Sequence, residues 1–255
     1  MAAPIVMVHG AFCGGWAFDA FRRPFEAAGH AVHAPDLRGH GQGDAADAVV
    51  GLSMSDYAKD VAGLCAALPE PPVLIGHSLG GLVAQLAARR TPVKALALLA
   101  PSAPWGVSGS SVEEAVTAMG LHMLGPFWAQ AVPPDRQLML TYSLNRMPKG
   151  QRRAILERLR PESGRALWET LNWWLDPFMT TSLGVGPAPA PCLVIAGERD
   201  VVHPPGTVRQ TAQRLGVQAQ IAPGMSHWLL GEPGWDQVAR DVLEWLAQTG
   251  AKDAA

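Results

Sequence analysis

The 255-residue chain lacks long apolar runs, has few cysteines and carries little net charge, and each absence excludes a class of protein. No apolar stretch reaches the roughly 18 residues that a membrane-spanning helix needs, so we expect no membrane partner. The formal net charge of −2 gives no reason to expect nucleic acid or an acidic membrane surface as a partner. No basic segment precedes the first apolar run, which predicts a cytoplasmic location unless a leader has been removed.

The cysteines and histidines indicate neither a disulfide framework nor a metal site. Cys13, Cys65 and Cys192 are odd in number and share no ligand spacing, so we expect buried free thiols. No pair of histidines has ligand spacing with a carboxylate, and no metal is expected. The segment Gly41–Ala46 formally fits a dinucleotide fingerprint, but no strand leads straight into it, so no cofactor is expected.

The most informative segment that is present is Gly76–Gly80, with the sequence Gly-His-Ser-Leu-Gly. The apolar run Pro72–Ile75 before it is typical of a buried parallel strand, and Leu82–Ala87 after it has helical spacing that ends before Pro92. Ser78 is therefore predicted on a sharp turn from strand to helix. Such a turn exposes the hydroxyl beside the positive end of a helix, where an oxyanion is stabilised. Ser78 is the predicted nucleophile.

A second buried strand, Pro191–Ala196, runs into a turn that carries two carboxylates, Glu198 and Asp200. A serine nucleophile of this kind is followed in the chain first by an acid and then by a histidine, each after a strand. The spacing of the turn favours Asp200 as the acid. No independent physical argument excludes Glu198.

A weaker apolar run, Ala219–Ala222, precedes a loop that ends in His227, the predicted base. In this interpretation Asp200 holds the imidazole in the tautomer whose free nitrogen accepts the Ser78 proton. Other histidines receive different predictions. His77 is expected to pack or to form a hydrogen bond, and both His40 and His203 are expected on exposed loops.

The first predicted strand, Pro4–Val8, breaks at His9–Phe12, where a glycine lets the backbone fold back across the edge of the sheet. The backbone N–H groups of Ala11 and Leu79 are predicted to form an oxyanion hole, with Phe12 as the alternative to Ala11.

These segments together resemble the α/β-hydrolase fold family, and they follow the family's order over nearly the whole chain. The resemblance implies a mostly parallel sheet of about six strands flanked by helices, in a compact branch similar to bacterial esterases and to plant methylesterases and hydroxynitrile lyases. The matching segments are His9-Gly10, Asp36–Gly41, Gly76–Gly81, Gly197–Asp200 and Gly224–His227.

The resemblance also predicts how the chain is divided. Residues 1–104 and 187–250 would form the hydrolase core, 105–186 a helical cap inserted after the sixth strand of the family, and 251–255 a flexible tail. No clear strand is predicted in the cap, which is rich in large apolar residues. Most of these can hold the cap together, but some should face the substrate. The predicted pocket residues are Phe12, Trp105, Trp128, Trp173, Trp174 and Trp228.

The implied activity is that of a serine hydrolase that cleaves carboxylic esters of small to medium apolar acyl or aromatic groups through an acyl-enzyme. The partner is then a small apolar ester. Thioester, lactone or carbon–carbon hydrolysis, cyanohydrin cleavage and peracid formation use the same three residues and remain alternatives. A scaffold that binds a ligand without catalysis is the alternative from another class. The sequence predicts no oligomeric state.

Overall fold

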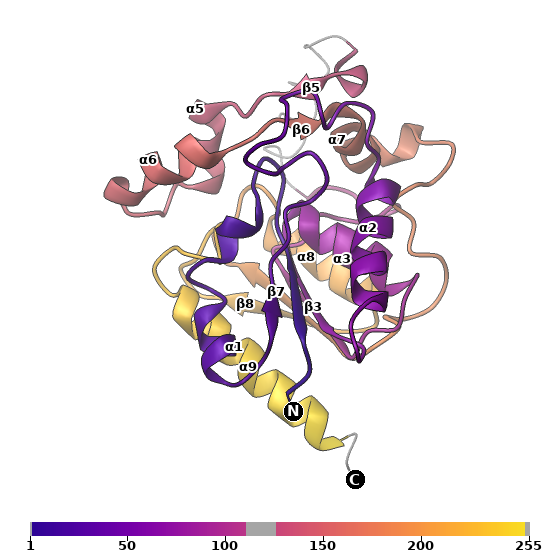
Figure 1. Ribbon diagram of the computed structural model, residues 1–255, viewed down its shortest axis with the longest axis vertical. Helices are drawn as coiled ribbons and strands as arrows, with labels where there is room; N and C mark the ends of the chain where they lie inside the picture. Colours follow the sequence, from indigo (N-terminus) through magenta and orange to yellow (C-terminus); the bar gives the residue numbers. More distant parts are fainter. Residues whose placement is uncertain (1, 111–125, 253–255) are drawn as a thin grey trace.

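A computed structural model describes residues 2–110 and 126–252 of the chain (Figure 1). Part of the predicted cap, 111–125, and most of the predicted tail, 253–255, lie outside the described residues.

The core is one six-stranded sheet in which every pair of neighbouring strands is parallel, as the resemblance predicts. The strand order is β2-β1-β3-β4-β7-β8, so the chain starts one strand in from an edge, adds that edge strand with β2 and then extends the sheet in the opposite direction to β8. The strands are β1 (Ile5–Val8), β2 (Val32–His33), β3 (Val73–His77), β4 (Ala95–Leu99), β7 (Cys192–Gly197) and β8 (Ala219–Ala222).

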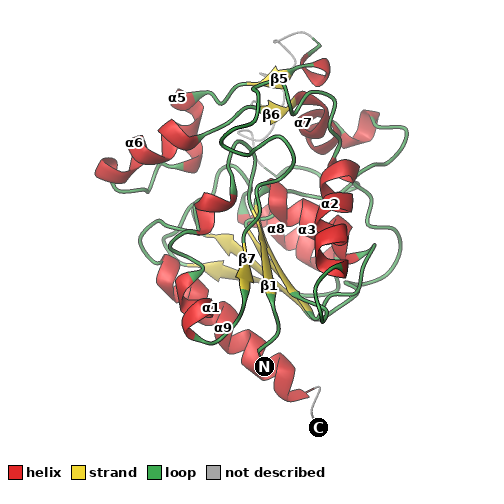
Figure 2. Cartoon of the chain, viewed as in Figure 1, coloured by secondary structure: helices red, strands yellow, loops and turns green. Residues whose placement is uncertain are grey.

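Two apolar layers cover the sheet, because alternate residues of each buried strand face opposite sides. In β1, Val6 and Val8 pack in one layer, and Ile5 and Met7 in the other. The first layer is completed by α2 (Met54–Ala66), α3 (Leu79–Ala88) and α8 (Pro205–Arg214). The second is completed by the 3-10 helix η1 (Gly15–Phe18), α1 (Arg23–Ala27) and α9 (Trp235–Lys252). Figure 2 shows the helices on both sides of the strands.

A segment between β4 and β7 lies over the end of the sheet where β1 finishes (Figure 1). Its helices form much of this cap, but it also holds a two-stranded antiparallel ribbon, although the sequence indicated no strand there. Each strand has only two residues, too few for an alternating pattern to be recognised. The elements are η2 (Phe127–Ala129), β5 (Ala131–Val132), α5 (Arg136–Leu138), η3 (Met139–Ser143), α6 (Lys149–Arg158), β6 (Glu162–Ser163), α7 (Gly164–Leu171) and η4 (Trp173–Leu175).

None of the helices among the described residues is both long and apolar enough to cross a membrane.

Candidate active site

Ser78 occupies the turn between β3 and α3 in a conformation that few side chains adopt, with φ of +54° and ψ of −125°. The backbone holds it there, because its N–H donates to the Leu99 carbonyl at 3.1 Å and its carbonyl accepts from the Ser102 N–H at 2.9 Å. Such strain costs on the order of 1–3 kcal/mol and persists only where the surroundings fix it. The strained turn is the one that the sequence predicted.

Two glycines make this turn possible because backbone segments approach them closely. A Cβ on Gly76 would collide with the Gly80 carbonyl, and a Cβ on Gly80 would collide with the carbonyls of Val8 and His9. Helix α3 can therefore begin directly against the end of β1, which brings the loop after β1 beside Ser78.

His227 lies within hydrogen-bonding distance of both other residues of the predicted triad. Its Nε2 is 3.0 Å from Ser78 Oγ, and its Nδ1 is 2.8 Å from Asp200 Oδ2. All three side chains are buried. Since a carboxylate only accepts, Nδ1 carries the proton and Nε2 is the nitrogen that can accept one from the serine.

Asp200 follows β7, and its carboxylate accepts hydrogen bonds from the backbone as well as from the imidazole. Its Oδ1 accepts the N–H groups of Val202 at 2.8 Å and His203 at 3.0 Å. Burial acts to raise the pKa of Asp200, but the charge of His227 and the hydrogen bonds from His227 and His203 outweigh burial and keep this pKa below its ordinary value. The carboxylate therefore stays ionised beside the histidine.

Glu198, the other carboxylate of the turn, faces away from the histidine. It is exposed and accepts the Gly224 N–H at 2.7 Å, and so braces the loop that leads to His227. The structure brings Asp200, and not Glu198, to the imidazole.

Three neighbours support the position of His227. His77 Nε2 donates to the His227 carbonyl at 2.9 Å, and the Ser226 N–H donates to Glu232 at 2.7 Å. The ring of His203 lies 5.2 Å from the ring of His227, and its Nε2 is 2.9 Å from Ser102 Oγ. His203 lies in a loop, as expected, but it is half-buried and not fully solvated, because the turn after Asp200 directs its ring to Ser102 and His227. Burial lowers the pKa of His77 to about 3 and that of His203 to about 4.

The predicted oxyanion donors lie at the start of α3 and in the loop after β1. A Cβ on Gly10 would lie 3.0 Å from the Ser78 Cβ, so the loop passes directly over the serine. Among the described residues, the N–H groups of Ala11 and Leu79 have no acceptor. The Phe12 N–H is directed elsewhere, to the Glu162 carboxylate at 3.4 Å.

The six predicted pocket aromatics do not share one environment. Trp105 and Trp173 are half-buried and meet edge to face at 5.3 Å, and within the described chain the buried Nε1 of Trp105 has no partner. Trp128 and Trp174 are 46% and 57% exposed. Trp228 is buried and stacked on Trp16 at 6.3 Å, which makes it a support behind the site. Phe12 is half-buried at the turn.

His40 is also placed differently from the expectation. It was predicted on an exposed loop, but its ring is buried and its Nε2 lies 3.1 Å from the buried Glu162 carboxylate. Sequence reasoning did not single out Glu162 at all. Both errors have one cause, because the two residues are 122 positions apart and meet only when the cap docks.

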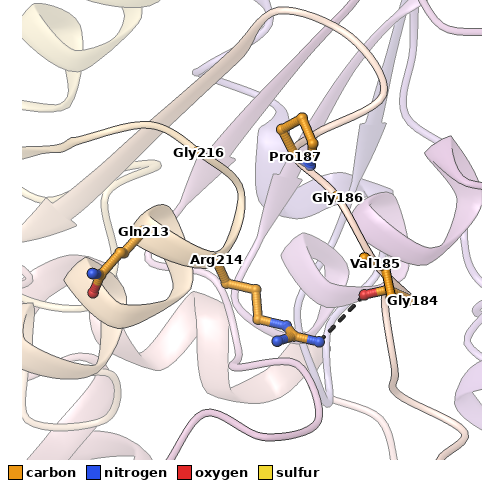
Figure 3. Close-up of a pocket in the computed structure, with 7 residues that line it drawn as sticks. All are labelled: Gly184, Val185, Gly186, Pro187, Gln213, Arg214 and Gly216. Carbon is orange, nitrogen blue, oxygen red and sulfur yellow. Dashed lines mark hydrogen bonds between the residues drawn. The ribbon is translucent and has the colours of Figure 1, made fainter.

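A hollow on the surface is lined by Gly184–Pro187, Gln213, Arg214 and Gly216 (Figure 3). It is formed where the chain enters β7 and where α8 ends, and Arg214 donates across it to the Gly184 carbonyl at 3.3 Å. The amino ends of the strands lie here, whereas the triad lies at their carboxyl ends. The hollow also holds no nucleophile. Among the described residues, no three histidine, cysteine or acidic side chains converge as a metal site.

Comparison with known families defines the class of protein. The model of the family described as "Alpha/beta hydrolase family" matches residues 5–241. This covers most of the chain, and the chain belongs to the α/β-hydrolase family.

Similar proteins include several esterases. A pyrethroid hydrolase from Sphingobium wenxiniae is 39% identical over 95 residues, which are 37% of this chain and about a third (34%) of that protein's length. A pimeloyl-[acyl-carrier protein] methyl ester esterase from Chromobacterium violaceum is 31% identical over 88% of this chain and 89% of its own length. The solved structure of a methylesterase from Arabidopsis has the same fold, with a TM-score of 0.74 at 18% identity over 96% of this chain and 99% of its own.

Proposed function

We propose that this protein is a serine esterase that hydrolyses carboxylic esters with an apolar acyl or aromatic group. The observation that carries the proposal is the continuous hydrogen-bonded chain from Ser78 Oγ through His227 to Asp200, at 3.0 and 2.8 Å. The backbone N–H groups of Ala11 and Leu79 beside it have no acceptor in the part of the chain that the structure describes. Relatives whose names are those of ester hydrolases support ester cleavage over the other reactions of the same three residues.

In the first half of the reaction, Ser78 Oγ attacks the ester carbonyl while its proton passes to His227 Nε2. The carbonyl oxygen becomes an oxyanion that accepts the N–H groups of Ala11 and Leu79. Asp200 stabilises the imidazolium. When the tetrahedral intermediate collapses, the carbon–oxygen bond to the alcohol breaks, and His227 gives that alcohol its proton.

In the second half, water attacks the acyl-enzyme and its proton passes to His227 Nε2. The same two N–H groups stabilise the second oxyanion. Collapse of this intermediate breaks the bond to Ser78 Oγ, which recovers its proton from His227, and the carboxylic acid leaves. No step requires a group from outside the chain other than water.

The proposed substrate class rests on the cap. Trp105 and Trp173 present half-buried aromatic surface, and Trp105 Nε1, which has no partner among residues 2–110 and 126–252, offers one donor to a polar atom of the substrate. The segment that carries Trp105 leaves β4 beside the nucleophile, because the Ser102 N–H donates to the Ser78 carbonyl at 2.9 Å. An apolar acyl or aromatic group fits such a wall better than a charged acid does.

A series of p-nitrophenyl esters from acetate to dodecanoate tests the proposal. We expect kcat/KM to rise about tenfold over two added carbons, because each buried methylene contributes about 0.8 kcal/mol, and then to decline for long chains. Trp173→Ala should flatten the rise, and the exposed Trp174 serves as the matched control, so Trp174→Ala should preserve it. Equal rates on acetate and hexanoate esters, or a preference for a charged acid, would contradict the apolar pocket.

A further inference from the structure

A buried carboxylate on the cap reaches the loop that carries an oxyanion donor. Glu162 in β6 has no exposed surface, and its two oxygens receive several donors. Tyr57 OH donates to Oε1 at 2.8 Å, and the Ser163 N–H donates to the same oxygen at 2.7 Å. His40 Nε2 lies 3.1 Å from Oε2, and the Phe12 N–H donates to this oxygen at 3.4 Å. The carboxylate thus joins the cap, α2 and the turn after β1.

Glu162 and His40 form a charged pair. Burial acts to raise the pKa of Glu162, but the charge of His40 and the hydrogen bonds that the carboxylate accepts hold this pKa below its ordinary value. Burial acts to lower the pKa of His40, but the adjacent Glu162 carboxylate outweighs it and raises this pKa. A carboxylate fixed in this way is a permanent acceptor for the Phe12 N–H.

The cap contacts Phe12 from a second direction. The backbone N–H of Arg160, two residues before Glu162, donates to the Phe12 carbonyl at 2.8 Å. Phe12 has a φ of +64°, in the region that a bulky residue seldom enters. The turn around it is closed by the Cys13 N–H, which donates to the Gly10 carbonyl at 3.3 Å. A strained turn of this kind needs support, and the segment 160–162 holds both backbone polar groups of its strained residue.

We propose that Glu162 is a positioning residue for the oxyanion hole. This inference rests on the proposed function. The Phe12 N–H belongs to the peptide that follows Ala11, so the carboxylate sets the direction of that peptide and, with it, the direction of the Ala11 N–H over Ser78. The hole then has its working geometry only when the cap is docked on the loop after β1. Glu162 does not touch the substrate; it acts through the turn.

The test compares two buried carboxylates of the same cap. Glu169 in α7 also ties the cap to α2, by accepting the Met54 N–H at 2.8 Å, and it makes no hydrogen bond to the turn after β1. We expect Glu162→Gln to lower kcat about tenfold to a hundredfold, with KM within about twofold. Displacing an oxyanion donor by a fraction of an ångström should lower kcat by less than the factor of about 10²–10³ that is lost when one such donor is removed. Glu169→Gln should leave kcat within about twofold.

A second measurement separates the oxyanion hole from the rest of the site. A trifluoromethyl ketone that carries the preferred acyl chain adds Ser78 Oγ to its carbonyl and places an oxyanion in the hole. Its affinity should fall in Glu162→Gln by the same factor as kcat, while binding of the matching alcohol, which forms no oxyanion, stays unchanged. Equal losses in Glu162→Gln and Glu169→Gln, or a change in KM alone, would overturn the proposal.

Tyr57→Phe provides the test if Glu162→Gln does not fold. It removes one donor to the carboxylate and keeps the carboxylate itself, so a loss of about threefold in kcat and in ketone affinity is expected. Unchanged ketone affinity in that variant would overturn the proposal. Failure of the proposed function has a different result, because the wild type would then hydrolyse none of the esters, or Ser78→Ala would retain the activity, whatever happens at position 162.

Discussion

Two buried carboxylate–histidine pairs lie beside the carboxyl ends of the strands, and they differ in what the second nitrogen of each imidazole meets. In one pair, Asp200 lies 2.8 Å from His227, and the other nitrogen of the ring is 3.0 Å from the Ser78 hydroxyl. In the other pair, Glu162 lies 3.1 Å from His40. The other nitrogen of that ring is 3.2 Å from a backbone carbonyl, that of residue 38.

The group at the second ring nitrogen decides what each histidine can do. A hydroxyl both donates and accepts, so His227 can take a proton from Ser78 and return it. A carbonyl only accepts, so His40, between a carboxylate and a carbonyl, meets an acceptor at each nitrogen, which favours the imidazolium and agrees with its raised pKa. A carboxylate and an imidazole are therefore arranged as the proposed base at one place and as an ion pair at the other.

The largest effect should come from replacing the carboxylate of the first pair. Asp200→Asn is expected to lower kcat on the order of 10⁴, because the amide no longer holds the tautomer that accepts the serine proton; this magnitude is that of the serine-protease example of the same triad. Glu162→Gln should stay within about a hundredfold. The control is Glu198→Gln in the same turn, which should change kcat little. If Glu198→Gln were the more damaging substitution, the two carboxylates would have to exchange roles.

Breaking the Glu162–His40 pair should lower the free energy of unfolding more than breaking the Asp200–His227 pair. Glu162→Gln leaves the buried charge of His40 without its partner, which typically costs about 3–5 kcal/mol of the free energy of unfolding. The pKa of Glu162 is lowered, so its contribution is present above the ordinary value of 4.5 and is lost as pH falls through the folded pKa. The pKa of His40 is raised, so its contribution is present below the ordinary value of 6.5 and is lost as pH rises through the folded pKa.

Urea unfolding of the wild type and of Glu162→Gln should therefore differ most between about pH 4.5 and 6.5, and less at both extremes. A stability difference that is the same at every pH would show that the pair is not ionised.

The smallest effect concerns Cys13. This residue lies in the turn after β1, which carries the proposed oxyanion donor Ala11 and is bound by Glu162. Burial and then the negative charge of Glu162 raise the pKa of this thiol, so it stays protonated and unreactive. Iodoacetamide at pH 8 should leave Cys13 unmodified and the activity unchanged in the folded protein, and should modify it in urea. Faster alkylation in Glu162→Gln would show that the carboxylate helps to keep the thiol protonated, whereas rapid alkylation of the folded wild type would contradict a buried, protonated Cys13.

The sheet and the meeting of Ser78, His227 and Asp200 could be predicted from sequence because their signals are local. Each of Ser78, Asp200 and His227 follows an apolar run that is also a strand in the structure, and parallel strands carry such residues to one edge. The strand β2 was not singled out, because it has two residues and neither is buried.

The link between cap and core could not be predicted, because it depends on contacts between distant residues. Glu162 lies in a two-residue strand with no recognisable pattern, and His40 lies in a glycine-rich loop that is typical of the surface. Only docking of the cap removes both from water. The exposure of the cap aromatics could not be predicted either, because Trp173 and Trp174 are adjacent in sequence but only Trp173 is half-buried.

The most direct test of the central claim is labelling with a fluorophosphonate, followed by mass spectrometry of the intact protein and of its peptides. We expect one covalent adduct per chain on Ser78, slower labelling of Asp200→Asn, and no adduct on a folded Ser78→Ala variant. An adduct on another residue, or labelling that persists in Ser78→Ala, would contradict the assignment of Ser78 as the nucleophile.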